Sequence, residues 1–216
     1  MDISVKTTLA PTHRTACLVV PVFERRKLSA TALQLDASAN GYLTKILKQG
    51  DMDGKAGQTL MLQRIDGITA ARVLLVGCGK EKEFDMRQFK DAVNAAMLVL
   101  NDSGANDATS YLADAEVRDC TYTQRLRIEA ETALHARYRF DQLKTKNDQT
   151  EPRLQRMVLN VIEAENLATA KMAVEIGTAI GNGTWTGMTG GPDGTLYVSS
   201  SNCGTNSTLY TINPAN

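Results

Sequence analysis

The residues best suited to bind a ligand lie in the segment Val76-Gly77-Cys78-Gly79-Lys80, directly after an apolar run. Backbone N–H groups of such a turn can bind a phosphate, and Lys80 could supply a counter-charge. This pattern predicts an anion-binding turn at Gly77, Gly79 and Lys80. However, the segment lacks the third glycine of G-x-G-x-x-G and does not match the P-loop pattern G-x-x-x-x-G-K-[ST]. A tight turn with close backbone packing explains the glycines equally well and is the favoured interpretation.

Cysteine and histidine residues supply few further candidates for a catalytic or metal-binding role. Cys78 would be a reactive thiol if a helix N-terminus lowered its pKa, but the sequence fixes no general base beside it. No C-x-x-C pair is present, and with two histidines the zinc-finger spacings are absent. His13 and His135 lie 122 positions apart and are expected to be solvated or capping residues. We expect all four cysteines to be small buried hydrophobes: Cys17, Cys78, Cys120 and Cys203.

One cluster of basic residues could contact the phosphates of a nucleic acid: Arg125, Arg127, Arg137, Arg139, Lys144 and Lys146. Three acidic residues are interleaved with it, which favours a solvent-exposed helix face with i,i+4 ion pairs: Glu129, Glu131 and Asp141. No Asp/Glu/His grouping has the spacing of a two-metal site, and no G-x-S-x-G sequence is present. The residues themselves therefore predict no catalytic, cofactor-binding or metal-binding site.

Hydrophobic patterning predicts alternating strands and helices that position these candidates. Strands are expected at 3–8, 16–23, 57–65, 71–76, 108–113 and 157–162. Helices are expected at 27–49 with a break at Asn40-Gly41, from Asp85 to about 101, at 123–143 and at 163–180, with a turn-rich linker at 144–152. Asp85 and Gln88 have the spacing of a capping box. This alternation predicts an α/β fold with a mixed, mostly parallel sheet sandwiched by helices.

Composition and charge limit the classes of function. The 216 residues are 43% hydrophobic and 22% charged, which is typical of a globular domain and not of a disordered chain. Basic and acidic residues number 24 each, so the net charge is zero. This disfavours an autonomous nucleic-acid binder, although a local basic patch is compatible with it. Neither a long apolar run nor an apolar signal segment is present, which predicts a cytoplasmic protein without a membrane span.

The end of the chain differs from the rest. Residues 181–216 contain a single charged residue, Asp193, and are rich in Gly, Thr, Ser and Asn. The turn Pro192-Asp193-Gly194 and the alternation at 195–199 and 208–212 predict a β-hairpin. This tail resembles one blade of a β-propeller, and a single blade cannot bury its faces alone. We expect a marginal hairpin, an added sheet edge or a disordered segment. A truncated gene, a fusion, or an engineered or misassembled reading frame would each explain the junction.

The order and wording of several segments in the first 180 residues carry a family resemblance: Cys17 to Ser29 (CLVVPVFERRKLS), Gly57 to Leu62 (GQTLML), Val73 to Asp85 (VLLVGCGKEKEFD), Phe140 to Lys146 (FDQLKTK) and Met157 to Val161 (MVLNV). They resemble the amino-terminal domain of the bacterial leucyl (cytosol) aminopeptidases. The resemblance implies a macro-domain-like α/β domain at 1–162 and the start of an interdomain helix at 163–180. Residues 181–216 lie outside it and form the β-rich tail.

The resemblance also implies a function. Members of this family are hexameric dimetal exopeptidases, and their two divalent metals, zinc or manganese, are held by a carboxy-terminal domain with the signature N-T-D-A-E-G-R. That signature does not occur in this sequence, so no catalytic or metal-binding residue can be transferred. We expect an accessory domain, inactive alone, with a role in assembly or regulation; its partners would be further copies of itself or a catalytic domain. The alternatives are a small macro-like module that binds a phosphate-bearing ligand or DNA, which zero net charge does not favour, and an inert fragment.

Overall fold

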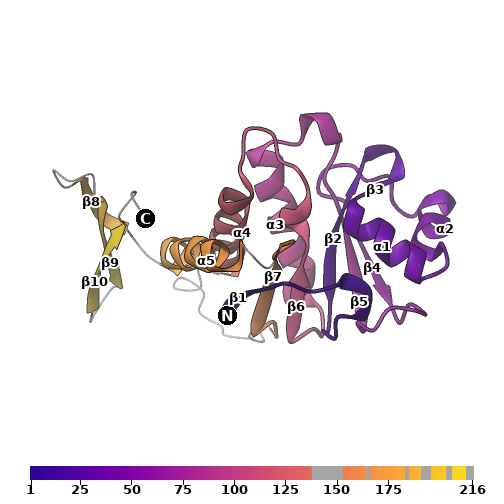
Figure 1. The fold of residues 1–216 in the computed structure, drawn as a ribbon, viewed down its shortest axis with the longest axis horizontal. Coiled ribbons are helices and arrows are strands. Elements are labelled where there is room, and N and C mark those ends of the chain that lie inside the picture. The colour runs from indigo at the N-terminus through magenta and orange to yellow at the C-terminus, as the bar shows by residue number, and fades with distance from the viewer. Residues whose placement is uncertain (138–152, 164–165, 183–184, 191–195, 203–205, 213–216) are drawn as a thin grey trace, which may run out of the picture.

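The computed structural model describes residues 1–137, 153–163, 166–182, 185–190, 196–202 and 206–212. A seven-stranded sheet lies between layers of helices, and a three-stranded sheet follows it in the chain (Figure 1). The large sheet contains β1 (Asp2–Lys6), β2 (Leu18–Phe23), β3 (Lys27–Leu28), β4 (Thr59–Gln63), β5 (Arg72–Gly77), β6 (Asp107–Ser110) and β7 (Arg156–Asn160). The helices are α1 (Ala30–Ser38), α2 (Tyr42–Gln49), α3 (Met86–Asp102), α4 (Tyr122–Arg137) and α5 (Leu167–Asn182).

The strands of the large sheet follow the order β1-β7-β6-β2-β5-β4, with β3 paired to β2. All neighbours from β1 to β5 in this order are parallel, whereas β4 and β3 pair antiparallel with β5 and β2. The predicted mixed, mostly parallel sheet is therefore confirmed. β1, near the amino terminus, lies at one edge of this sheet.

The two central strands are buried on both faces because helices cover both sides of the sheet. Val20 of β2 and Leu75 of β5 face one core, which includes Leu35 of α1. The preceding pair in the register, Val19 and Leu74, faces a second core, to which α3, α4 and α5 contribute. Such strands have apolar residues at successive positions instead of an alternating pattern. The chain therefore leaves β2 towards one face and β5 towards the other.

Helix α3 begins where the sequence predicts. The backbone amide of Gln88 donates to Asp85 Oδ1 at 3.0 Å, and Gln88 Oε1 accepts from the Asp85 amide at 3.2 Å. This capping box satisfies two amides that would otherwise lack partners in the first turn. The predicted capping pair is confirmed.

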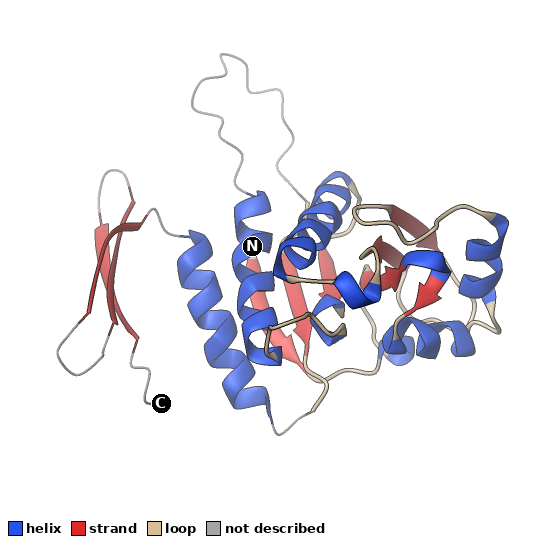
Figure 2. Ribbon diagram, turned by 90° about the horizontal axis from the view of Figure 1, so that it is seen from above, coloured by secondary structure: helices blue, strands red, loops and turns tan. Residues whose placement is uncertain are grey.

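Helices α4 and α5 pack side by side, and α5 also contacts the edge strand β1 (Figure 2). Gly177 permits the close approach, since a Cβ atom there would lie 2.3 Å from the carbonyl oxygen of Arg127. Ala170 and Val174 of α5 are buried in the same core as α3 and α4. Within the described residues, no helix has the length and apolar character needed to cross a membrane.

Some predicted boundaries are wrong. Lys27–Leu28 forms β3 instead of the start of a helix, and α1 begins after Ser29, whose Oγ accepts from the Ala32 amide at 3.2 Å. The helix expected from 163 begins at Leu167. Of the helix expected at 123–143, the structure describes α4 up to Arg137. Its expected end and the linker at 144–152 lie outside the described residues. Short-range patterns do not separate the two-residue strand β3 from a helix start, because pairing with β2 decides its structure.

The tail contains one more strand than the sequence predicts. β9 (Leu196–Asn202) and β10 (Asn206–Ile212) form the expected antiparallel hairpin, and β8 (Trp185–Gly190) pairs with the other side of β9. Both views place this small sheet beyond α5, away from the seven-stranded sheet (Figures 1 and 2). The division of the chain at 162 and 180 stays a prediction.

Candidate functional site

The connections after β2 and β5 create a crevice at the carboxyl edge of the sheet. These strands are parallel neighbours, yet α1 follows β2 on one face and α3 follows β5 on the other. Adjacent connections that leave in opposite directions separate the two loops, and ligands of open α/β sheets bind at such topological switch points. We call the crevice the switch-point pocket.

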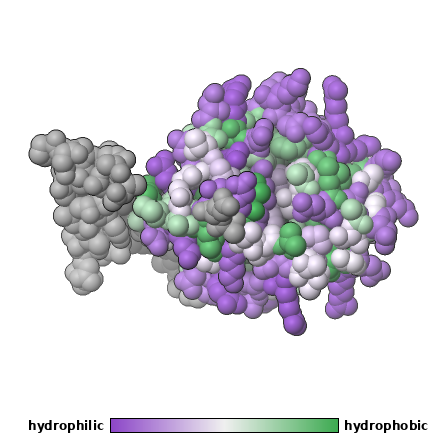
Figure 3. Space-filling view, in the orientation of Figure 1, coloured by the Kyte–Doolittle hydropathy of each residue, from purple (hydrophilic) through white to green (hydrophobic). Residues whose placement is uncertain are grey.

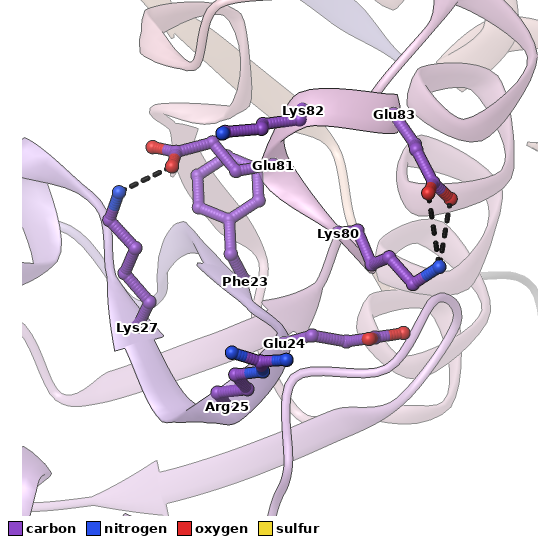
Figure 4. Close-up of a pocket in the computed structure, with 8 residues that line it drawn as sticks. All are labelled: Phe23, Glu24, Arg25, Lys27, Lys80, Glu81, Lys82 and Glu83. Carbon is purple, nitrogen blue, oxygen red and sulfur yellow. Dashed lines mark hydrogen bonds and ion pairs between the residues drawn. The ribbon is translucent and has the colours of Figure 1, made fainter.

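The switch-point pocket has a volume of about 310 Å³ and lies between two short segments (Figure 4). The segment after β2 supplies Phe23, Glu24, Arg25 and Lys27, and the segment after β5 supplies Lys80, Glu81, Lys82 and Glu83. Lys27 forms an ion pair with Glu81 across the pocket, and Lys80 Nζ lies 3.0 Å from Glu83 Oε1. The hydrogen bond to Glu83 raises the pKa of Lys80, so the ammonium group stays charged at neutral pH.

The backbone beneath the pocket is held by close contacts at glycines. The amides of Gly77, Cys78 and Gly79 donate to the carbonyl oxygens of Gln58, Val22 and Gly54 at 2.7, 2.9 and 3.0 Å. A Cβ atom at Gly77 would lie 2.0 Å from the carbonyl oxygen of Lys55. Gly77 thus permits close backbone packing, and Gly79 adopts a φ of 75° that suits the turn. The anion-binding turn stays a prediction, and the geometry weighs against its proposed donors, because these three amides already have partners.

Arg25, which lines the pocket, and its neighbour Arg26 have an unusual backbone conformation. Arg25 and Arg26 have φ angles of 61° and 62°, in the left-handed region that non-glycine residues rarely adopt. Arg26 is anchored to Asp53, with Nη2 3.1 Å from Oδ1 and its amide donating to the Asp53 carbonyl oxygen at 3.3 Å. The sequence does not predict this conformation, because side-chain types do not report on φ.

The cysteines that the structure describes are mostly inert. Cys17 and Cys78 are buried, and burial raises the pKa of each thiol to about 12. Neither is a nucleophile at neutral pH. Cys120 is only partly buried, which contradicts the expectation for that residue, and Cys203 lies outside the described residues.

The histidines are on separate elements. His13 Nε2 lies 2.9 Å from Thr109 Oγ1, and burial followed by the nearby Lys6 lowers the His13 pKa. His135 is exposed on α4. Within the described residues, no three His, Cys, Asp or Glu side chains form a group that could hold a metal ion.

The prediction of a solvent-exposed face on α4 is wrong for two residues. Glu129 is completely buried and Arg125 is buried with its guanidinium 5.3 Å from the centre of the Tyr122 ring. Arg127 is exposed, and Arg139, Lys144 and Lys146 lie outside the described residues. Alternating charges predict a solvated face from short-range pattern alone, whereas here the packing of α4 on the sheet buries part of that face.

A buried polar cluster that the sequence does not predict lies at the carboxyl ends of β1, β6 and β7. Asp114 accepts from Asn160 Nδ2 at 3.1 Å and from Thr31 Oγ1 at 3.2 Å. Asn160 Oδ1 in turn accepts from the Thr8 amide at 3.0 Å. Burial raises the pKa of Asp114 to about 6.

Glu129 completes this buried acid cluster. Burial, and then the charge of Asp114, raise its pKa to about 8, against the opposing effect of Ser110 and the Ala113 amide. Neither carboxyl oxygen is well placed for a hydrogen bond with any residue the structure describes. The carboxyl group is therefore mostly protonated at neutral pH. No sequence signal marks it, because Glu129 lies among other charged residues along the chain.

Comparison with known proteins assigns the fold to a family. A model of the amino-terminal domain of the cytosol aminopeptidase family matches residues 19–147. The chain belongs to the cytosol aminopeptidase family. A probable cytosol aminopeptidase of Tolumonas auensis is 41% identical over 183 residues, which are 85% of this chain and 37% of that protein. The chain thus spans little more than a third of the relative's length.

Solved structures show the same fold. A mutant of tomato leucine aminopeptidase matches with a TM-score of 0.60 at 17% identity, over 80% of this chain and 35% of the other. The bottromycin maturation enzyme BotP matches with a TM-score of 0.51 at 20% identity, over 74% of this chain and 30% of the enzyme. Cytosol aminopeptidases are metalloenzymes, and the matched part of this chain is their amino-terminal domain. The switch-point pocket and the acid cluster are therefore features of that domain.

Proposed function

We propose that this chain acts as the accessory domain of a leucyl aminopeptidase-type exopeptidase, with a role in assembly or regulation. By itself it does not hydrolyse peptides. The match to the amino-terminal family model carries this proposal. The two metal ions of the complete enzyme, zinc or manganese, would be held outside the described residues, and they would activate water and polarise the scissile carbonyl.

Helix α5 supports a role in assembly. Its inner face packs on α4 and β1, whereas Met172 on its outer side is 50% exposed. Figure 3 shows hydrophilic residues around most of the α/β domain's outline and hydrophobic residues in scattered patches between them. An exposed methionine on a helix at the edge of the domain is suited to contact another domain or a second copy of the chain.

Hydrolysis of leucine p-nitroanilide, with and without added manganese or zinc, tests the first part of the proposal. We expect no turnover from the purified, folded chain. Metal-dependent turnover that a chelator abolishes would contradict it, and would mean that this chain carries its own catalytic site.

Sedimentation of the chain, alone and mixed with the carboxy-terminal part of the Tolumonas auensis protein, tests the role in assembly. We expect association that Met172→Lys weakens. Leu98→Lys is the matched control, because Leu98 is 65% exposed but lies on α3. Equal effects of the two variants, or no association of the unaltered chain in either sample, would contradict a docking role for α5.

A further inference from the structure

We propose that the switch-point pocket binds the phosphate group of a small molecule, with Arg25, Lys80 and Lys82 as its cationic ligands. The donors are side chains from the two loops, and not the backbone amides at 77 to 79, which are occupied. The site is separate from the accessory role in assembly, which concerns α5. Four observations on this part of the molecule support it.

The first observation is the pocket's place in the fold. It lies at the carboxyl ends of the parallel strands β2 and β5, where their connections part to opposite faces of the sheet. Its volume of about 310 Å³ is at the lower end of the range of ligand sites, which is roughly 300 to 1,000 Å³. A small phosphate ester fits such a volume, whereas a dinucleotide does not.

The second observation concerns charge. The lining carries four basic side chains and three acidic ones, Glu24, Glu81 and Glu83, which leaves a net charge of +1. Arg25 and Lys82 make no ion pair or hydrogen bond within the described part of the chain. Figure 4 shows Arg25 on the β2 side of the pocket and Lys80 and Lys82 on the β5 side. A phosphate between the loops would pair with cations from both.

The third observation is the backbone at Arg25. Left-handed conformations of bulky residues persist only where the surroundings enforce them, and they concentrate at ligand sites. Here the neighbouring Arg26 is fixed to Asp53 by side chain and main chain. That anchor holds the turn, and the turn places the Arg25 side chain in the pocket's lining.

The fourth observation is the close packing of the backbone beneath the pocket. A Cβ atom at Gly54 would lie 2.0 Å from the Phe23 carbonyl oxygen, and one at Gly77 equally close to that of Lys55. The amide of Glu24 donates to the Gly79 carbonyl oxygen at 2.8 Å. The two loops are thereby joined through backbone contacts. A backbone that is already fixed before binding limits the entropy that the two loops lose when the ligand arrives.

Titration of the ¹⁵N-labelled chain with inorganic phosphate and with glycerol 3-phosphate, at constant ionic strength, tests the proposal. We expect saturable shifts confined to the amides of 24–27 and 80–83, with the ester binding more tightly because it fills more of the pocket. Arg25→Gly should weaken binding about tenfold, a usual effect of removing one charged hydrogen-bond donor. Glu24→Gln should strengthen it about threefold, because it removes a competing negative charge.

Two controls separate binding from folding. Arg25→Gly should raise the melting temperature by about 2 °C, because glycine adopts positive φ without strain, so its loss of affinity would not reflect unfolding. Lys171→Ala on α5 removes an exposed cation far along the chain and should leave binding unchanged. Unsaturable shifts spread over the surface, equal affinity in Arg25→Gly, or equal losses in Lys171→Ala would each overturn the proposal.

Discussion

The switch-point pocket and the buried acid cluster lie at the same edge of the sheet, but the charged groups of the pocket are exposed and those of the cluster are buried. In the pocket, charged groups are exposed and pair with one another, as Lys80 does with Glu83. In the acid cluster, Asp114 accepts hydrogen bonds from Asn160 and Thr31, and Glu129 is completely buried. Burial costs a charged group far more than an ion pair in water returns.

The difference determines which region couples to pH. Exposed pairs keep their charge in the folded and unfolded states, so their titration changes stability little. The buried carboxyls hold protons in the folded state that they would release in the unfolded state at the same pH. We therefore expect the acid cluster to control stability, while the pocket's charges remain free to serve a ligand.

The largest expected effect is the pH dependence caused by Glu129. Its pKa rises from 4.5 to about 8 on folding, so its stabilising effect is complete below pH 4.5 and is lost as the pH rises through 8. The loss is on the order of 5 kcal/mol at most. Glu129→Met should remove this loss, and urea unfolding at pH 5 and pH 9 measures it. An unchanged slope of stability against pH in the variant would show that Glu129 is ionised in the folded state.

Asp114 should give a smaller effect in a lower pH range. Its pKa rises from 3.8 to about 6, so stability is lost as the pH rises through 6, by about 3 kcal/mol at most. Asp114→Asn keeps the shape without the charge and should flatten the curve of stability against pH between 4 and 6. Urea unfolding at both pH values, with Asp91→Asn on the surface as the control, measures the change. The same flattening in both variants would show that Asp114 does not cause the loss of stability between pH 4 and 6.

The glycines in and near the backbone beneath the pocket offer a comparison of stabilities that does not depend on pH. Gly77→Ala forces a methyl group to within 2.0 Å of the Lys55 carbonyl oxygen, and the required backbone shift should cost about 2 to 3 kcal/mol. Gly57→Ala, at a φ of 78° with no heavy atom within 4 Å, should cost about 1 kcal/mol from backbone strain alone. Thermal unfolding of both variants tests the order. A smaller loss at Gly77 would mean that the two loops are not held by close contact.

The predictions from sequence succeed where neighbours along the chain decide the structure. The capping pair at Asp85 and Gln88, the apolar strands β2 and β5 and the hairpin β9–β10 all depend on contacts that the local pattern encodes. The expected close backbone packing is confirmed at Gly77, whereas Gly79 supplies a positive φ of 75° for the turn.

The site residues depend on contacts distant in sequence, and the predictions fail there. Glu129 follows Arg125 by one helical turn, which suggests a surface ion pair, but the packing of α4 on the sheet buries both side chains. The left-handed backbone of Arg25 depends on Asp53, 27 positions from its neighbour Arg26. Lys80 was the one pocket residue that the sequence singled out, since a glycine-containing turn after a strand marks the carboxyl edge of a sheet. The wall opposite it comes from a different loop, and no local pattern joins the two.

The smallest expected effect is that of the ion pair between Lys27 and Glu81 across the pocket. Both side chains are more than one-third exposed, so a double-mutant cycle with Lys27→Ala and Glu81→Ala should give a coupling energy of about 0.5 kcal/mol or less, falling with added salt. Such a weak pair can open for a ligand at little cost, as a binding pocket requires. A salt-independent coupling above about 2 kcal/mol would instead make the pair a structural clamp. The pocket and the acid cluster would then both serve stability, and the contrast between them would be lost.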